Sequence, residues 1–169
     1  MKAAGVLLRS VLALWAIASG GAAAADPSAL VGVWKLVEYS TADPDSGERF
    51  HPFGRNASGY LMYTPGGRMS ALLQAENRKR FSAGNRISAP AQERAEAFST
   101  STAYMGRYSY EGERVIHHVE LSTNPDWVGA DQLRYPKLEG RRLTITTPPL
   151  PTRPDGKLRV STLVWEKVE

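Results

Sequence analysis

The chain of 169 residues carries 21 Lys and Arg against 17 Asp and Glu, a formal net charge of +4, and it has no cysteine. This balance argues against a nucleic-acid partner, because phosphate binding requires clustered positive charge rather than a mild excess. The lack of cysteine excludes disulfides, thiol catalysis and thiolate metal sites. The three histidines show no spacing typical of zinc ligands, so the sequence predicts neither a metal site nor a cofactor.

Residues 1–25 have the features of a secretory signal peptide. Lys2 gives the charged start, an apolar run follows, and small residues lead to Ala25. The uninterrupted apolar stretch, residues 11–18, is too short to cross a bilayer. We therefore expect cleavage after Ala25, export to the periplasm or the medium, and no integral membrane segment after cleavage. The remaining chain, residues 26–169, has the length of one domain and a net charge of +2 once the two basic residues of the leader are lost.

From Leu30 onward, short segments of alternating apolar and polar residues are separated by turn sequences. Three pairs of these segments flank glycine-containing turns, which is typical of β-hairpins. The predicted strands are residues 30–40, 59–64, 68–74, 104–110, 114–122, 132–138, 142–147 and 158–168. Consecutive hairpins without alternating helices predict an all-β fold, an antiparallel up-and-down barrel of about eight strands, because closure removes exposed edges.

Residues 88–98 depart from this pattern and predict one short helix. Ser88 is a candidate N-cap, and Pro90 suits the first turn. We expect the helix to cover one end of the sheet with a modest apolar stripe. The stripe consists of Ala91, Ala95 and Phe98.

Gly32 and Trp34, on the first predicted strand, form a G-x-W motif that resembles the opening signature of lipocalin and calycin barrels. Further motifs follow in order at residues 59–70, 117–129 and 132–134. Together they resemble the bacterial and fungal lipocalin-like domain family over nearly the whole chain after the leader. The resemblance implies a small lipocalin-like β-barrel with a cavity; it implies no reaction, because the family has no agreed catalytic set.

His117 and His118 are neighbours on one predicted strand and therefore point to opposite faces. Val115, Val119 and Leu121 share the face of His117, so we expect that face to be interior and His118 to be exterior. The two imidazoles then cannot share a metal or a ligand. For His117 two alternatives remain: an interior histidine hydrogen-bonded to a tyrosine hydroxyl or a carboxylate, or a functional residue, either a polar contact to a bound ligand or a general base.

Other polar and aromatic residues are candidates for a cavity lining. Arg134 is either an outer-face salt-bridge partner of Glu120 or an anchor for an acidic ligand. Trp127 follows a turn sequence and is expected at the barrel mouth, whereas Trp34 and Trp165 are expected to pack its base. The predicted ligand-binding set is His117, Tyr108, Tyr110, Tyr104, Tyr60, Arg134 and Trp127. The inward face of the strand that carries Tyr60 is ambiguous.

The common catalytic motifs are absent from the sequence: it has no Gly-x-Ser-x-Gly elbow, no phosphate-binding loop, no His-Glu-x-x-His and no glycosidase-like carboxylate pair. No catalytic residue is therefore assigned. The sequence predicts an exported barrel that binds a small hydrophobic or amphipathic molecule in its interior. The alternative is an isomerase, cyclase or dehydratase that uses the same cavity with His117 as acid or base. A filled barrel that serves only as an interaction module is a third possibility.

Overall fold

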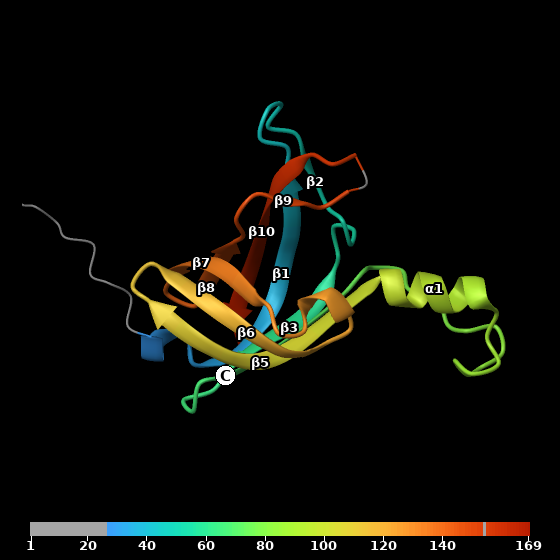
Figure 1. Cartoon of the computed structure of the whole chain (residues 1–169), viewed down its shortest axis with the longest axis horizontal. Coiled ribbons are helices and arrows are strands. Elements are labelled where there is room, and N and C mark those ends of the chain that lie inside the picture. The colour runs from blue at the N-terminus through green and yellow to red at the C-terminus, as the bar shows by residue number, and fades with distance from the viewer. Residues whose placement is uncertain (1–26, 154) are drawn as a thin grey trace, which may run out of the picture.

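A computed structural model describes residues 27–153 and 155–169 (Figure 1). The predicted signal peptide and its cleavage site lie outside these residues. The described elements are η1 (Pro27–Leu30), β1 (Gly32–Ala42), β2 (Arg49–Phe50), β3 (Ser58–Tyr63), β4 (Arg68–Gln74), α1 (Ala91–Ser99), β5 (Ser101–Glu111), β6 (Arg114–Ser122), η2 (Pro125–Trp127), β7 (Asp131–Glu139), β8 (Arg142–Thr146), β9 (Leu150–Pro151) and β10 (Leu158–Lys167). Within the described part of the chain, none of the helices is both long and apolar enough to cross a membrane.

Eight strands form a closed antiparallel barrel. Their order is β1-β3-β4-β5-β6-β7-β8-β10, and β10 pairs back with β1 from Trp34↔Lys167 to Ala42↔Val160. The two-residue strands β2 and β9 extend β1 and β10 at one end (Figure 1). The predicted all-β barrel is confirmed, and glycines at the predicted hairpin turns, such as Gly112 with φ 70°, adopt the left-handed conformation that tight turns require.

Two irregularities in the ladder change which side chains face inward. In β1 the register shifts between Leu36 and Glu38, so that Tyr39 faces the interior. In the β5–β6 pair it shifts at Gly106, which lies opposite Val119 while Met105 lies opposite Leu121. The extra residue lies in β6. It moves the side chains at the end of that strand to the other face, because one inserted residue reverses the alternation that follows it. The predicted inward position of Leu121 is therefore wrong: its side chain is 63% exposed.

One end of the barrel is filled by packed side chains. Trp34, Trp165, Leu30 and Leu143 are fully buried there, and the Trp34 indole N–H donates to the Leu30 carbonyl at 2.8 Å. A β-carbon on Gly32 would lie 2.3 Å from a backbone oxygen at the chain's end, so only glycine allows this approach. The base is thus closed by apolar packing and by the last residues of the chain.

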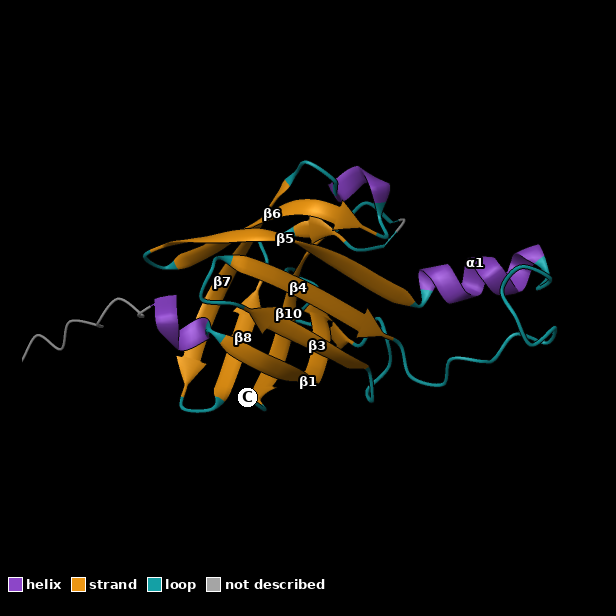
Figure 2. Cartoon of the chain, turned by 90° about the horizontal axis from the view of Figure 1, so that it is seen from below, coloured by secondary structure: helices purple, strands orange, loops and turns teal. Residues whose placement is uncertain are grey.

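The segment between β4 and β5, residues 76–100, forms an arm that carries α1. Both views show α1 projecting away from the barrel (Figures 1 and 2), and none of its residues is buried. The expectation that α1 covers one end of the sheet is therefore wrong, and Phe98 is 58% exposed. Pro90 rather than Ser88 holds the N-cap position, with no side-chain capping bond. The helix binds its own loop instead: Ser82 donates from its backbone N–H and its hydroxyl to Glu93, at 3.0 and 2.6 Å.

Candidate functional site

A cavity of about 310 Å³ lies inside the barrel at the end opposite the packed base. It meets the lower limit of the range typical of small-molecule sites, roughly 300 to 1,000 Å³. Its walls come from β1, β4, β5, β7, β10, η2 and the segments beside β2 and β9. The lining residues are Tyr39, Pro52, Phe53, Leu73, Thr102, Tyr104, Trp127, Gln132, Arg134, Thr147, Leu150, Pro151, Thr152, Ser161 and Leu163.

Strand alternation brings three of the polar lining residues, from β5 and β7, to the cavity. Tyr104 faces inward from β5, and Gln132 and Arg134, two residues apart, face inward from β7. In the β6–β7 ladder His117 pairs with Gln132 and Val115 pairs with Arg134, so all four residues share the inner face. The imidazole of His117 therefore lies beside the polar wall of the cavity.

Aromatic rings form a second part of the lining. Trp127 contacts Tyr104 edge to face, with ring centroids 5.5 Å apart, and Tyr39 contacts Phe53 in the same way at 5.5 Å. The short helix η2 positions Trp127. At its start the Asn124 side chain accepts a hydrogen bond from the Asp126 backbone N–H at 3.1 Å. The result is a cavity with a large apolar wall and a few convergent polar groups, the composition expected of a ligand site.

His117 is held between two tyrosines below the cavity and is 1% exposed. Its Nε2 lies 2.6 Å from the Tyr63 hydroxyl and its Nδ1 lies 3.0 Å from the Tyr104 hydroxyl. Burial, and after it the positive charges of Arg134 and His118, hold the pKa of His117 well below its usual value, so the imidazole is neutral. The interior, tyrosine-bonded alternative for His117 is the one that the geometry supports.

A neutral imidazole carries one N–H, so it donates to one tyrosine hydroxyl and accepts from the other. Tyr63 is buried, and burial raises its pKa well above the usual value, so its hydroxyl keeps its proton. A protonated tyrosine hydroxyl can donate or accept, so both ring nitrogens of His117 are satisfied in either tautomer. The Tyr104 hydroxyl also borders the cavity.

Arg134 is buried inside the barrel, with 7% of its surface exposed. Its guanidinium donates to the Leu133 carbonyl at 2.8 Å and to the Gln132 side-chain oxygen at 3.4 Å. The alternative of an outer salt bridge to Glu120 is wrong: Glu120 pairs with Arg68 and with Arg107, the latter at 3.2 Å. In the described ranges no carboxylate lies within ion-pair distance of Arg134.

The structure separates the seven predicted lining residues into three groups. Tyr104, Trp127 and Arg134 line the cavity, and His117 borders a narrow space of about 20 Å³ that also touches Tyr104 and Arg134. Tyr108 and Tyr110 are absent from both linings and pack against the core; the Tyr108 hydroxyl donates to the Thr64 carbonyl at 3.0 Å. Tyr60 is on the outer wall, 48% exposed, because Leu61 and Tyr63 are the inward residues of β3.

Several lining residues were not predicted. Tyr39 follows the bulge in β1, and Phe53, Leu150 and Thr152 lie outside the predicted strands. Thr102 and Gln132 lie in strands with a clear alternation, and their positions two residues from Tyr104 and Arg134 were the signal that identifies them as inward.

His118 lies on the outer wall, as predicted, within a chain of three polar side chains. Its Nε2 is 2.9 Å from the Ser109 hydroxyl, and its Nδ1 is 2.7 Å from the Asp131 carboxylate. The hydroxyl, imidazole and carboxylate lie in the same order as in the catalytic triad of a serine hydrolase. None of the three residues lines the cavity, however, and the chain of bonds links β5, β6 and β7 across the outside of the barrel.

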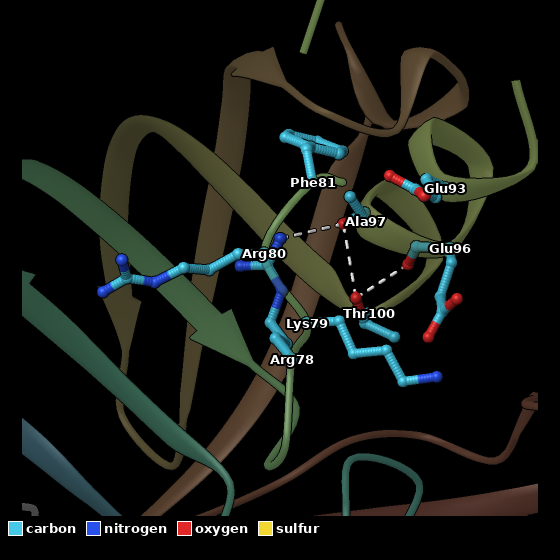
Figure 3. Close-up of a pocket in the computed structure, with 8 residues that line it drawn as sticks. All are labelled: Arg78, Lys79, Arg80, Phe81, Glu93, Glu96, Ala97 and Thr100. Atoms are coloured by element: carbon cyan, nitrogen blue, oxygen red, sulfur yellow. Dashed lines mark hydrogen bonds between the residues drawn. The ribbon is translucent and has the colours of Figure 1, made fainter. Parts of the chain in front are cut away.

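A second hollow, of about 170 Å³, lies in the arm between its loop and α1 (Figure 3). Arg78 crosses it and donates to the Ala97 carbonyl at 3.1 Å, and the Thr100 hydroxyl donates to the Glu96 carbonyl at 2.7 Å. Its lining mixes exposed basic and acidic side chains with a single aromatic ring, Phe81. It lacks the enclosed apolar wall of the barrel cavity, which remains the stronger candidate site. The described residues contain no group of three or more acidic or histidine side chains that would hold a metal ion.

A closed eight-stranded antiparallel barrel, filled at one end and hollow at the other, has the architecture of the small barrels whose interior has room for one small ligand. The chain belongs to the family described as lipocalin-like domain, whose model matches residues 31–168. Comparison with curated proteins and with solved structures gave no match. The resemblance stated from the sequence motifs is confirmed by this family match.

Proposed function

We propose that this protein is an exported binding protein that holds one small amphipathic molecule in the open end of its barrel. The observation that carries the proposal is the 310 Å³ cavity, whose lining combines aromatic and aliphatic side chains with Tyr104, Gln132 and Arg134. The family fold supports the same kind of function, since lipocalin-like barrels of eight strands have room for one small ligand. Export rests on the leader-like pattern of residues 1–25.

Blocking the cavity tests the binding proposal. Thr102 lies in the lining, whereas Thr144 lies between two buried residues of β8 and therefore faces outward. In a fluorescence titration with the neutral dye Nile red, we expect Thr102→Trp to weaken binding about tenfold or more and Thr144→Trp to leave it unchanged. Equal binding by both variants, each with a cooperative thermal melt, would place the dye outside the barrel and refute the proposal.

Two measurements on protein from its own host complete the test. The mass of the mature chain shows whether cleavage follows Ala25, and an uncleaved chain found in the cytoplasm would refute export. Native mass spectrometry of the same material is expected to show a small molecule bound at one per chain.

Catalysis in the same cavity is a second candidate, and one contact favours it. The Tyr104 hydroxyl borders the cavity and lies 3.0 Å from His117 Nδ1, so the buried imidazole can exchange a proton with a ligand through this tyrosine. The molecule recovered by mass spectrometry distinguishes the candidates. Its conversion by wild-type protein but not by Tyr104→Phe supports an enzyme, and its recovery unchanged after incubation supports a binding protein.

A further inference from the structure

Among the described residues that line the barrel cavity, Arg134 is the only charged one. The other polar groups of the lining are the hydroxyls of Tyr39, Thr102, Tyr104, Thr147, Thr152 and Ser161 and the amide of Gln132. A guanidinium is charged at every physiological pH. The described lining therefore carries one fixed positive charge and no negative charge.

The protein supplies this charge with few hydrogen-bond acceptors, and all of the described ones are neutral. Arg134 is 7% exposed, and its two hydrogen bonds go to neutral oxygens, one of them long at 3.4 Å. A guanidinium has five N–H donors, so most of them lack a described acceptor. A guanidinium on a cavity wall with neutral acceptors alone has no opposite charge, so a carboxylate that enters the cavity gains a charge-assisted partner there.

The chain neutralises its other deeply buried arginine. Arg159 donates to both oxygens of Asp155, at 2.7 and 2.6 Å, and lies 3.6 Å from the Asp43 carboxylate. The missing partner of Arg134 is thus a property of the cavity rather than of the protein as a whole.

From this contrast we infer that the natural ligand is an organic monoanion, a carboxylate on a compact apolar body, whose oxygens pair with Arg134. The planar guanidinium matches a carboxylate with two parallel hydrogen bonds. A dianionic phosphate is a poorer match, because no second cation lines the cavity. The apolar body would lie against Phe53, Trp127 and Leu163, which belong to the same lining. This inference rests on the proposed function, since it names the class of ligand for that same cavity.

Naphthalene-2-carboxylate and its neutral isostere naphthalene-2-carboxamide form a matched pair of probes. Calorimetric titration of wild-type protein is expected to show binding of the carboxylate about tenfold to a hundredfold tighter than of the amide, the range for hydrogen bonds to a charged group. Arg134→Gln is expected to remove this preference while the amide still binds. Arg134→Lys keeps the charge without the planar fork, and we expect it to restore part of the preference.

The control variant is Arg107→Gln, which removes an exposed arginine of β5 from the outer wall and should leave both affinities unchanged. Thermal melts of all variants confirm that each is folded. Equal binding of the two probes by wild-type protein, or a preference that survives Arg134→Gln, overturns the monoanion and leaves the binding function standing. Failure of both probes to bind wild-type protein up to their solubility limits overturns the binding function together with the inference.

Discussion

Arg134 and Arg159 are both buried arginines, but they have opposite surroundings. Arg159, at the rim beside β9, is 4% exposed and pairs with Asp155 and Asp43. Arg134, inside the barrel, is 7% exposed and has only neutral acceptors. The two arginines differ in their carboxylate partners. Loop residues at the rim supply carboxylates to Arg159, whereas the cavity wall supplies none to Arg134.

The largest expected effect follows from removing the paired arginine. Arg159→Met leaves Asp43 and Asp155 without their cation, and we expect it to lower the Tm more than any other arginine variant considered below. Arg159 also lies 5.5 Å from the Phe50 ring centroid, so the variant loses a cation–π contact as well. Thermal unfolding followed by circular dichroism measures the change. A Tm equal to that of wild type would show that the two carboxylates are solvated without Arg159.

Acid unfolding gives an independent check on the same cluster. Hydrogen bonds from Arg159 hold the pKa of Asp155 at about 2, and the backbone N–H of Ser46 is the main cause of a lowered pKa for Asp43. A carboxyl whose pKa is lower in the folded state contributes stability above its unfolded pKa, near 3.9, and loses it as the pH falls through the folded value. We expect wild-type protein to lose stability from about pH 4 towards pH 2, and Arg159→Met to lose less.

The second effect concerns the histidine beside the unpaired arginine. The pKa of His117 is lowered in the folded state, so the unfolded chain binds a proton there first, at about pH 6.5. This contribution to stability is complete above pH 6.5 and falls as the pH decreases towards the folded pKa, by at most about 1.4 kcal/mol per pH unit. Urea unfolding at several pH values measures the slope.

Three variants test the source of that slope. His117→Gln should remove it, and Arg134→Gln should end it at a higher pH, because the charge of Arg134 is one cause of the lowered folded pKa of His117. His51→Gln serves as the control, since His51 is not among the residues that surround His117; its Nδ1 lies 3.1 Å from the Tyr39 carbonyl oxygen. A slope that persists in His117→Gln would assign the pH dependence to another group.

A third, smaller effect has the opposite sign from the first. Arg134→Met replaces an unpaired buried charge with an apolar side chain of similar length, and we expect the free energy of unfolding of the empty protein to rise by about 1 kcal/mol. Chemical denaturation without ligand measures it. A loss of stability would mean that the guanidinium is satisfied in the folded protein, and the contrast between the two arginines would then disappear.

The smallest effect is expected at an exposed arginine. Arg107 pairs with Glu120 on the outer wall, where both side chains are largely exposed. Arg107→Gln should change the free energy of unfolding by less than about 0.5 kcal/mol, as is usual for surface ion pairs. The same denaturation series provides this value, and a larger change would remove Arg107 as a neutral baseline for the buried arginines.

The sequence predicted the barrel because its strands are short, alternate regularly and are joined by glycine turns. The inward position of His117 and the outward position of His118 follow from this alternation alone. Where alternation is interrupted, the prediction failed: the irregularity at Gly106 exposes Leu121, and the bulge in β1 brings Tyr39 inward. A bulge depends on backbone contacts between strands, such as the close approach of His118 to Gly106, and leaves little trace in the pattern of one strand.

Strand alternation also made part of the cavity lining predictable. Tyr104, Arg134 and Trp127 were identified as lining residues, but the alternative of a salt bridge from Arg134 to Glu120 was wrong, because a salt bridge depends on which strands become neighbours. Phe53 and Leu150 come from segments without periodicity, so no pattern marks them. The arm was misjudged because the stripe of Ala91, Ala95 and Phe98 is weak; nothing in the sequence shows whether so small an apolar face meets the sheet or remains outside it.

The position of the arm in the chain has a consequence for the architecture of the barrel. Its two ends meet where Gln74 pairs with Ser101, and the Ala75 N–H donates to the Thr100 carbonyl at 2.9 Å, so the ladder between β4 and β5 is complete without it. The arm is therefore an insertion into an ordinary hairpin connection. Because the entropy of closing a loop grows only slowly with its length, such a connection can lengthen, shorten or exchange its contents while the strands keep their register. It is the part of this barrel most open to evolutionary change and to grafting by design.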